Sequence, residues 1–319
     1  MIAIVRSARV RALGPLAAAL TFAVACDSGK APEQAALEAQ AAPSAPPPSG
    51  QQGPTAAEFA EKAMKERAQA VARAVNPDGL PPYSGPVGTI RGRVLIQGDP
   101  PPAAEPSKDP IPSEGCQRAH ELYGKLFRRG PEGTLADALV TVTEYKGFLP
   151  SVGEAIRVEA KGCAWNSRTF AMTFGQRLDI YNLDSQGYIP RLEGVPVGAF
   201  RLALPNGSPV PLFVPKPGQY TLVEQVRDYM RADVFVLQYP TARVTELDGR
   251  FELEGIPAGE VRVTAYLPVL QKHVDRVVSV VAGAAQELEL VLSFSRAEYD
   301  AQRAGAASPG KPAGDQGPK

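Results

Sequence analysis

The chain has 319 residues, with 34 acidic side chains, 34 Lys and Arg side chains and only two histidines. Its charges balance and no basic cluster exceeds Arg128-Arg129, so neither nucleic acid nor an anionic membrane surface is expected as a partner. With only His120 and His273, the composition disfavours zinc, haem and multi-histidine copper sites.

Residues 1–25 have the pattern of a secretory signal peptide. Arg6, Arg9 and Arg11 precede an apolar run over 12–25, which is shorter than the roughly 20 residues that a membrane-spanning helix needs. A small residue before Cys26 resembles a bacterial lipobox, although the usual Leu three residues before the Cys is absent. We expect palmitate-type lipidation at Cys26 and anchoring to the bacterial cell envelope; cleavage after Ala25 to release a soluble secreted protein is the alternative.

The segment 26–85 is predicted to be a lipidated flexible tether that contains one helix. Residues 26–54 are rich in Ala, Pro, Gln and Gly and are expected to be disordered. Thr55 and Glu58 form a capping-box pattern that opens a helix over 55–75. Its narrow apolar stripe favours a solvated tether helix over a partner-binding helix. At the other end of the chain, residues 296–319 are predicted to be a disordered tail.

Three cysteines divide into the lipidation candidate Cys26 and a pair, Cys116 with Cys163. In an exported protein this pair is expected to form a disulfide. A reactive thiol pair is the alternative, but the spacing lacks a Cys-x-x-Cys motif.

The region 86–295 alternates short β-branched runs with Gly, Pro and Asn turns, which predicts an all-β fold of Greek-key β-sandwiches. Asp248-Gly249 lies between the alternating runs 244–247 and 250–253, which predicts a hairpin with a type I′ turn. A short helix is also predicted around 113–123. The other predicted strands lie at 89–96, 139–145, 155–160, 169–174, 177–183, 200–204, 219–224, 233–238, 261–265, 276–281 and 287–292.

The run TELDGRFELEGIPAGEVRVTAY at 245–266 resembles carboxypeptidase regulatory-like, transthyretin-type domains. The opening strands of such domains are matched by Gly88, Gly92 and Val94 and by the run 138–142. The resemblance implies that 86–149 and 241–295 form one sandwich, with 150–240 inserted as a second. Two tandem sandwiches would give almost the same pattern, and both arrangements remain open.

The run KPGQYTLVEQVRDYMRADVFVL at 216–237 resembles the last two strands of methylamine-utilisation or plastocyanin-like cupredoxins. The resemblance implies copper ligands at four positions, where this chain has Tyr188 and Arg227 in place of His, Glu224 in place of Cys, and a retained Met230. A carboxylate and a guanidinium supply neither the soft thiolate nor the imidazoles of a blue-copper site. We therefore expect no metal, no other cofactor and a copper site that has degenerated.

Glu224 and Arg227 are close enough in sequence to form a charge-assisted hydrogen bond, with Tyr188 capping the pair. A solvated loop without such a contact, and a small-molecule pocket that also includes Tyr229, are the alternatives. Met230 is expected to be a packing residue, and Trp165 is expected to pack beside the disulfide.

No catalytic constellation is present, so the chain is expected to be a non-enzymatic structural or interaction module whose partners are envelope proteins or a surface polymer. One alternative is a periplasmic copper-handling or electron-transfer protein with an altered site. The other is a carbohydrate- or peptide-binding module, which should expose aromatic side chains on one face. The candidate aromatic residues are Tyr181, Tyr188, Phe200, Tyr220 and Tyr229.

Overall fold

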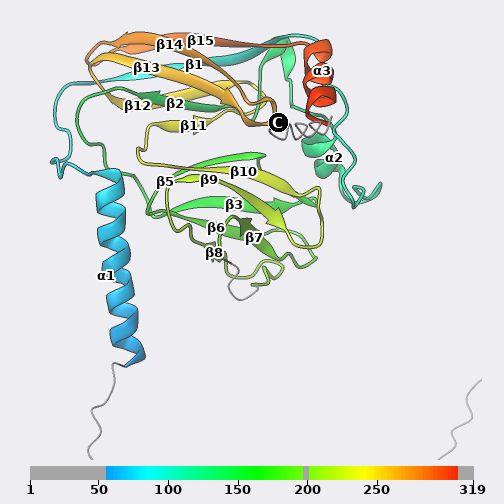
Figure 1. The fold of residues 1–319 in the computed structure, drawn as a ribbon, viewed down its shortest axis with the longest axis horizontal. Helices are drawn as coiled ribbons and strands as arrows, with labels where there is room; N and C mark the ends of the chain where they lie inside the picture. Colours follow the sequence, from blue (N-terminus) through cyan, green and yellow to red (C-terminus); the bar gives the residue numbers. More distant parts are fainter. Residues whose placement is uncertain (1–54, 197–200, 308–319) are drawn as a thin grey trace, which may run out of the picture. The chain divides into compact units, whose positions relative to one another are not determined.

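The computed structural model describes residues 55–196 and 201–307, and it has the all-β sandwich architecture that the sequence predicts. Figure 1 shows the strands in two groups, each built from two sheets. The predicted signal peptide, the lipidation at Cys26, the rest of the tether up to residue 54 and the end of the predicted tail lie outside the described residues.

The first sandwich is built from strands near both ends of the described chain. One sheet has the order β12-β1-β15 and the other has the order β11-β2-β13-β14. β1 is antiparallel to β12 but parallel to β15, and β2 lies between β11 and β13. The strands are β1 (Val87–Gly98), β2 (Leu139–Thr143), β11 (Ala242–Val244), β12 (Arg250–Pro257), β13 (Gly259–Leu267), β14 (Lys272–Val280) and β15 (Ala285–Phe294).

The second sandwich uses strands between residues 155 and 237, which pair only with one another in the described residues. Its sheets have the orders β5-β10-β9-β7 and β4-β3-β6-β8. The division of the chain into domains at these boundaries stays a prediction. The strands are β3 (Ala155–Lys161), β4 (Ala164–Trp165), β5 (Thr169–Thr173), β6 (Arg177–Asn182), β7 (Pro190–Glu193), β8 (Val210–Leu212), β9 (Gly218–Glu224) and β10 (Arg231–Leu237).

Each sandwich has its own hydrophobic core, because side chains alternate between the two faces of a strand. In the first sandwich, β1 and β13 turn Ile90, Val94 and Val263 inward, all of them fully buried. In the second, Leu178 and Leu222 from opposite sheets are equally buried. Burial of such side chains is the main favourable contribution to folding, at about 1.5–3 kcal/mol for each large apolar residue.

The predicted helix after Thr55 is present as α1 (Ala56–Val75), with both hydrogen bonds of the capping box. The prediction that this helix is solvated is wrong at its C-terminal end. Val71, Ala74 and Val75 in its last turns pack against the core of the second sandwich, and Arg67 stacks on the ring of Phe213 at 5.0 Å. The helix therefore has one packed end. None of the helices in the described ranges is long and apolar enough to span a membrane.

The short helix predicted near 113–123 is α2 (Gln117–Tyr123), and two 3₁₀ turns follow it at Pro131–Gly133 and Pro268–Leu270. The structure corrects the expected disordered tail, because residues 296–307 form a helix, α3 (Arg296–Ala307). Asp99 accepts a hydrogen bond from the backbone of Arg296, and the ring of Tyr299 packs against Phe294. The prediction of disorder used only the local composition of the tail, which contains no information about these contacts with the first sandwich.

The predicted Asp248-Gly249 hairpin is wrong. The strand before the turn, β11, pairs with β2, whereas β12 after the turn pairs with β1 in the opposite sheet. Only Gly249 has a positive φ, at 67°, whereas a type I′ turn needs positive φ at both central residues. The turn carries the chain across the core from one sheet to the other. The predicted strand at 200–204 is also absent as a strand in the described part of that segment, where only an isolated bridge joins Ala203 to Tyr188.

Asp137 links the two sandwiches. It lies just before β2, is 5% exposed and has a positive φ of 63°. Both of its carboxylate oxygens accept hydrogen bonds from Arg128, at 2.7 and 2.6 Å. Its Oδ1 also accepts the backbone N–H of Arg168 just before β5, and its carbonyl accepts the hydroxyl of Thr169. One buried residue therefore holds the start of β2 in the first sandwich to the start of β5 in the second.

Candidate functional site

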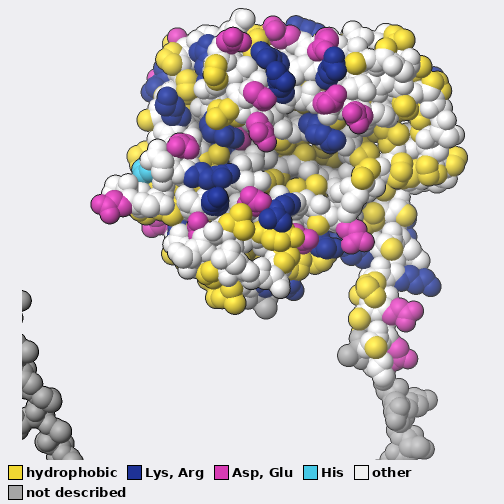
Figure 2. Space-filling view, turned by 180° about the vertical axis from the view of Figure 1, so that it is seen from behind, with side chains coloured by type: hydrophobic (Ala, Val, Ile, Leu, Met, Phe, Trp, Pro, Cys, Tyr) yellow, Lys and Arg dark blue, Asp and Glu magenta, His cyan; other side chains and the backbone are white. Residues whose placement is uncertain are grey.

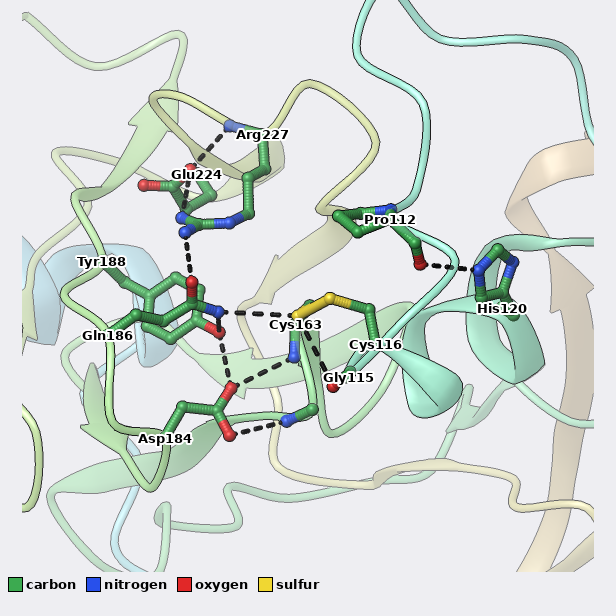
Figure 3. The surroundings of a disulfide bond; sticks show 11 residues. Pro112, Gly115, Cys116, His120, Cys163, Asp184, Gln186, Tyr188, Glu224 and Arg227 are labelled. Atoms are coloured by element: carbon green, nitrogen blue, oxygen red, sulfur yellow. Dashed lines mark hydrogen bonds and ion pairs between the residues drawn. A yellow bond between two sulfur atoms is a disulfide. The ribbon is translucent and has the colours of Figure 1, made fainter. Parts of the chain in front are cut away.

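The residues at the expected copper-ligand positions lie together in the second sandwich. Tyr188 follows β6, and Glu224 to Met230 form the end of β9 and its connection to β10. In Figure 3, Gln186 and Tyr188 lie between the Glu224–Arg227 pair and Asp184 with the disulfide. The fold thus brings the two segments into contact, as the resemblance implies.

The Glu224 carboxylate is almost completely buried, with 1% of its side chain exposed. Its Oε1 accepts the backbone N–H of Ile189 at 2.9 Å. Its Oε2 accepts the N–H groups of Val226 at 2.9 Å and of Arg227 at 2.6 Å. Three backbone donors therefore hold a buried negative charge, and they fix the loop after β9 at the same time.

Arg227 completes the pairing that the sequence suggested. Its guanidinium lies 3.4 Å from Oε2 of Glu224 and donates a hydrogen bond of 2.7 Å to Oε1 of Gln186. It also lies over the ring of Tyr188, 4.9 Å from the ring centre, which is a cation–π contact. The alternative of a solvated loop without this contact is wrong. Tyr188 does face the ion pair, but through its ring rather than its hydroxyl.

The hydroxyl of Tyr188 belongs to a second network on the far side of its ring. It donates to Oδ2 of Asp184 at 2.5 Å and accepts from Nε2 of Gln186 at 2.8 Å. Burial, together with the hydrogen bond to Asp184, raises the pKa of Tyr188 well above its usual value. The phenol therefore stays neutral at physiological pH.

Asp184 anchors this network to the disulfide loop. Burial acts to raise the pKa of Asp184, but the Tyr188 hydroxyl and the N–H groups of Gly162 and Cys163 favour the charged form, and the net result is a lowered pKa. Gln186 also reaches Sγ of Cys163 at 3.5 Å. The site and the disulfide loop are thus joined by one set of polar contacts.

The predicted disulfide between Cys116 and Cys163 is confirmed, with Cα atoms 5.2 Å apart. It joins the start of α2 to the turn between β3 and β4, next to Asp184 and Gln186 (Figure 3). Both cysteines are buried. Trp165 and Met230 are fully buried nearby, and the Trp165 indole donates to the carbonyl of Met230 at 3.1 Å. Met230 thus packs as predicted and acts through its backbone.

The residues at the four positions do not fit a copper ion. Both oxygens of Glu224 are held by backbone donors, and Arg227 places a permanent positive charge where an imidazole would be needed. The Tyr188 hydroxyl is directed to Asp184 instead. Within the described ranges, no group of three or more His, Cys, Asp or Glu side chains is arranged to hold a metal.

Of the aromatic residues considered for carbohydrate or peptide binding, the four that the structure describes do not form an exposed face. Tyr188, Tyr220 and Tyr229 are buried, with exposures of 0%, 6% and 8%. The ring of Tyr181 is covered by Arg157, whose guanidinium lies 3.8 Å from the ring centre. Phe200 lies outside the described residues. On the face seen in Figure 2, acidic and basic side chains are interspersed rather than separated.

Three residues with structural roles here carry no prediction from the sequence: Asp184, Gln186 and Asp137. The resemblance covers the segment from Asn182 to Tyr188 and matches Asn182 and Asp184, but it assigns Asp184 no role. An Asn and an Asp two residues apart favour side-chain bonds to the backbone. Asn182 does accept the N–H of Asp184 at 2.9 Å. The sequence carries no local signal for these contacts of Gln186 and Asp137. Gln186 also reaches Arg227, 41 residues away, and Asp137 also accepts from Arg168, 31 residues away.

No protein-family model matches the chain, and no curated protein matches it. Among solved structures it is similar to copper-containing nitrite reductase from Thermus scotoductus SA-01, at 16% identity and a TM-score of 0.23, over 30% of this chain and 25% of that one. It is also similar to amicyanin from Paracoccus versutus, at 14% identity and a TM-score of 0.24, over 30% of this chain and 96% of that one. An amicyanin mutant in the Cu(I) form gives 16% identity and a TM-score of 0.23, over 30% and 97% of the two chains. The chain spans a quarter of the length of the nitrite reductase. At such low TM-scores, the similarity says nothing about the chemistry of the site.

Proposed function

We propose that this protein is a non-enzymatic lipoprotein of the bacterial cell envelope, a structural or interaction module whose second sandwich has lost copper binding. The observation that carries the proposal is the Glu224–Arg227 ion pair at positions where the resembling family has Cys and His. Glu224 has both oxygens occupied and Arg227 bonds to Gln186, so the site is already saturated by the protein.

The physical argument concerns what such a pair stabilises. A buried carboxylate without partners would be costly, and removing one partner of a buried ion pair costs about 3–5 kcal/mol. Here the carboxylate instead organises the loop after β9, because it accepts three backbone N–H groups. In this proposal the site stabilises the loop after β9 instead of holding a redox metal.

Addition of Cu(II) to the purified protein tests the loss of copper binding. We expect no saturable binding of Cu(II) in equilibrium dialysis, a readout that does not depend on a free thiol. A triple variant, Tyr188→His with Glu224→Cys and Arg227→His, serves as the matched control because it restores the family's ligand types at the same three positions. Stoichiometric Cu(II) binding by the unmodified protein would refute the proposal and favour the copper-handling alternative.

The lipid anchor is tested separately by Cys26→Ser. We expect this variant to move from the membrane fraction to the soluble fraction, because a buried acyl chain contributes about 0.8 kcal/mol for each methylene. Continued membrane association would contradict the anchoring. Ser44→Ala is the control, since it changes another residue of the same segment without touching the predicted lipidation site.

A further inference from the structure

A cavity of about 440 Å³ lies behind the loop that carries Arg227. Its walls come from the Pro-rich segment 104–111, from α2 and from the connection between β9 and β10. Much of the lining is apolar, with Pro106, Pro110, Ile111 and the two tyrosines Tyr123 and Tyr229. Pockets of this size with apolar walls and a few polar groups are typical sites for small organic ligands.

The hydroxyl of Tyr229 is buried without a hydrogen-bond partner among the residues that the structure describes. The residue as a whole is only 8% exposed and lines the cavity. A buried hydroxyl without a partner is unfavourable, and such groups are rare in folded proteins. The other tyrosine of the lining, Tyr123, is different, because its hydroxyl accepts the backbone N–H of Trp165 at 3.1 Å. The hydrogen-bonding capacity of the Tyr229 hydroxyl is therefore unused among the described residues, at the wall of the cavity.

The lining also contains a cation, Arg168, that forms no ion pair with a carboxylate in the described residues. It is partly buried, and its guanidinium donates one hydrogen bond, from Nη1 to the carbonyl of Lys125 at 3.0 Å. Burial lowers the pKa of Arg168, because the charged form is less well solvated there, while the carboxylates of Asp137 and Asp233 act in the opposite direction. The guanidinium nevertheless stays protonated at physiological pH, so an anion close to it would be stabilised.

The other charges that line the cavity are already paired. Arg231 bonds to Glu193, and Asp228 lies 3.8 Å from Arg231. Glu105 contacts Arg303 of α3. After these pairs are formed, Arg168 is the cation of the described lining that has no ion-pair partner, although Asp137 and Asp233 outside the lining favour its charged form. A single such charge calls for one negative charge and not for a polyanion.

We propose that this pocket binds a small organic monocarboxylate with an apolar body. The carboxylate would accept hydrogen bonds from Arg168 and from the Tyr229 hydroxyl, and the apolar body would lie against the proline and tyrosine walls. This ligand site is separate from the degenerate copper site, although the same loop builds both. Glu224 fixes the N–H groups of Val226 and Arg227, and so sets where Tyr229 enters the wall.

The test uses isothermal titration calorimetry of the purified protein with three probes. Benzoate has both a carboxylate and an apolar ring, benzamide keeps the ring without the charge, and acetate keeps the charge with almost no apolar body. We expect saturable binding of benzoate. Benzamide should bind at least about tenfold weaker because it loses a hydrogen bond to a charged group, and acetate should also bind at least about tenfold weaker because it buries almost no apolar surface.

Two variants assign the contacts. Arg168→Gln removes the charge but keeps the backbone N–H that bonds to Asp137, and it should weaken benzoate binding at least about tenfold. Tyr229→Phe should weaken it about threefold or more without lowering the stability of the protein, because its hydroxyl has no partner to lose in the described residues. Arg118→Gln is the matched control, since Arg118 lines a different cavity of about 640 Å³.

Absence of saturable benzoate binding, or equal binding of benzoate and benzamide, would overturn the proposal. So would unchanged affinity in both Arg168→Gln and Tyr229→Phe, provided that circular dichroism shows both variants folded. None of these results bears on copper or on the lipid anchor, so the ligand site and the proposed function fail independently.

Discussion

Replacement of Asp137 by Asn should destabilise the protein out of proportion to the small change in shape. The carboxylate is 7% exposed and its partner Arg128 is 16% exposed, and they share two hydrogen bonds of 2.7 and 2.6 Å. Asn tolerates the positive φ of this position, so the backbone conformation is retained. The amide cannot neutralise Arg128, which leaves a buried charge without its partner.

Loss of one partner from a buried ion pair costs about 3–5 kcal/mol. The amide oxygen can still accept one hydrogen bond, so we expect a loss of about 3 kcal/mol in the free energy of unfolding, at the lower end of that range. The matched control is Glu287→Gln. Its pair with Arg91 is just as short, at 2.6 Å, but the two side chains are 68% and 51% exposed. Solvent screening makes such a pair weak, and we expect little change.

Urea denaturation provides the assay, followed by far-ultraviolet circular dichroism and by the fluorescence of Trp165, the only tryptophan. Circular dichroism reports on both sandwiches and Trp165 reports on the second, so separation of the two transitions would show that Asp137 also couples the units. If Asp137→Asn loses no more stability than Glu287→Gln, burial does not decide the strength of this pair and the reasoning is refuted.

Two further predictions concern the network beside the disulfide. The pKa of Asp184 is lowered below its ordinary value of 3.8, so its contribution to stability is present above that pH and is lost as the pH falls through the folded pKa. Asp184→Asn should therefore flatten the loss of stability below about pH 4, measured by urea unfolding at stepwise lower pH, and an unchanged pH profile would contradict this. Replacing Cys116 and Cys163 by Ser should lower the free energy of unfolding by about 4 kcal/mol, because 47 residues separate the cysteines. A midpoint in urea that does not move would contradict that estimate.

Much of the strand content could be predicted because alternation of apolar side chains is a local property. The runs at 89–96 and 139–145, for example, both appear as strands. Pairing was not predictable in the same way. Asp248-Gly249 has the composition of a hairpin turn, but the first sandwich needs its two flanking strands in opposite sheets. Residues 296–307 likewise form a helix that contacts Asp99 and Phe294, and these contacts could not be predicted from the local sequence.

The candidate site shows the same limit. Glu224 and Arg227 are three residues apart, so their pairing could be proposed from the sequence and the structure contains it. The reach of Arg227 to Gln186 spans 41 residues, and it depends on how two connections of the second sandwich meet. The unpartnered hydroxyl of Tyr229 is a property of the packed state alone. From the sequence, this residue could be considered as one edge of a different pocket or as one of the aromatic residues of a carbohydrate- or peptide-binding face.

The parallel pairing of β1 with β15 has a consequence for how the protein reaches its fold. Arg91 and Glu287 are neighbours in the sheet although 196 residues separate them in the chain. In the described residues β1 has no strand partner before residue 250, whereas β3 to β10 find all their strand partners between residues 155 and 237. Contacts of such long range slow folding, and an unpaired strand edge favours association with other chains. The second sandwich is thus able to form first, and a chain cut short before residue 250 would leave β1 without a partner strand.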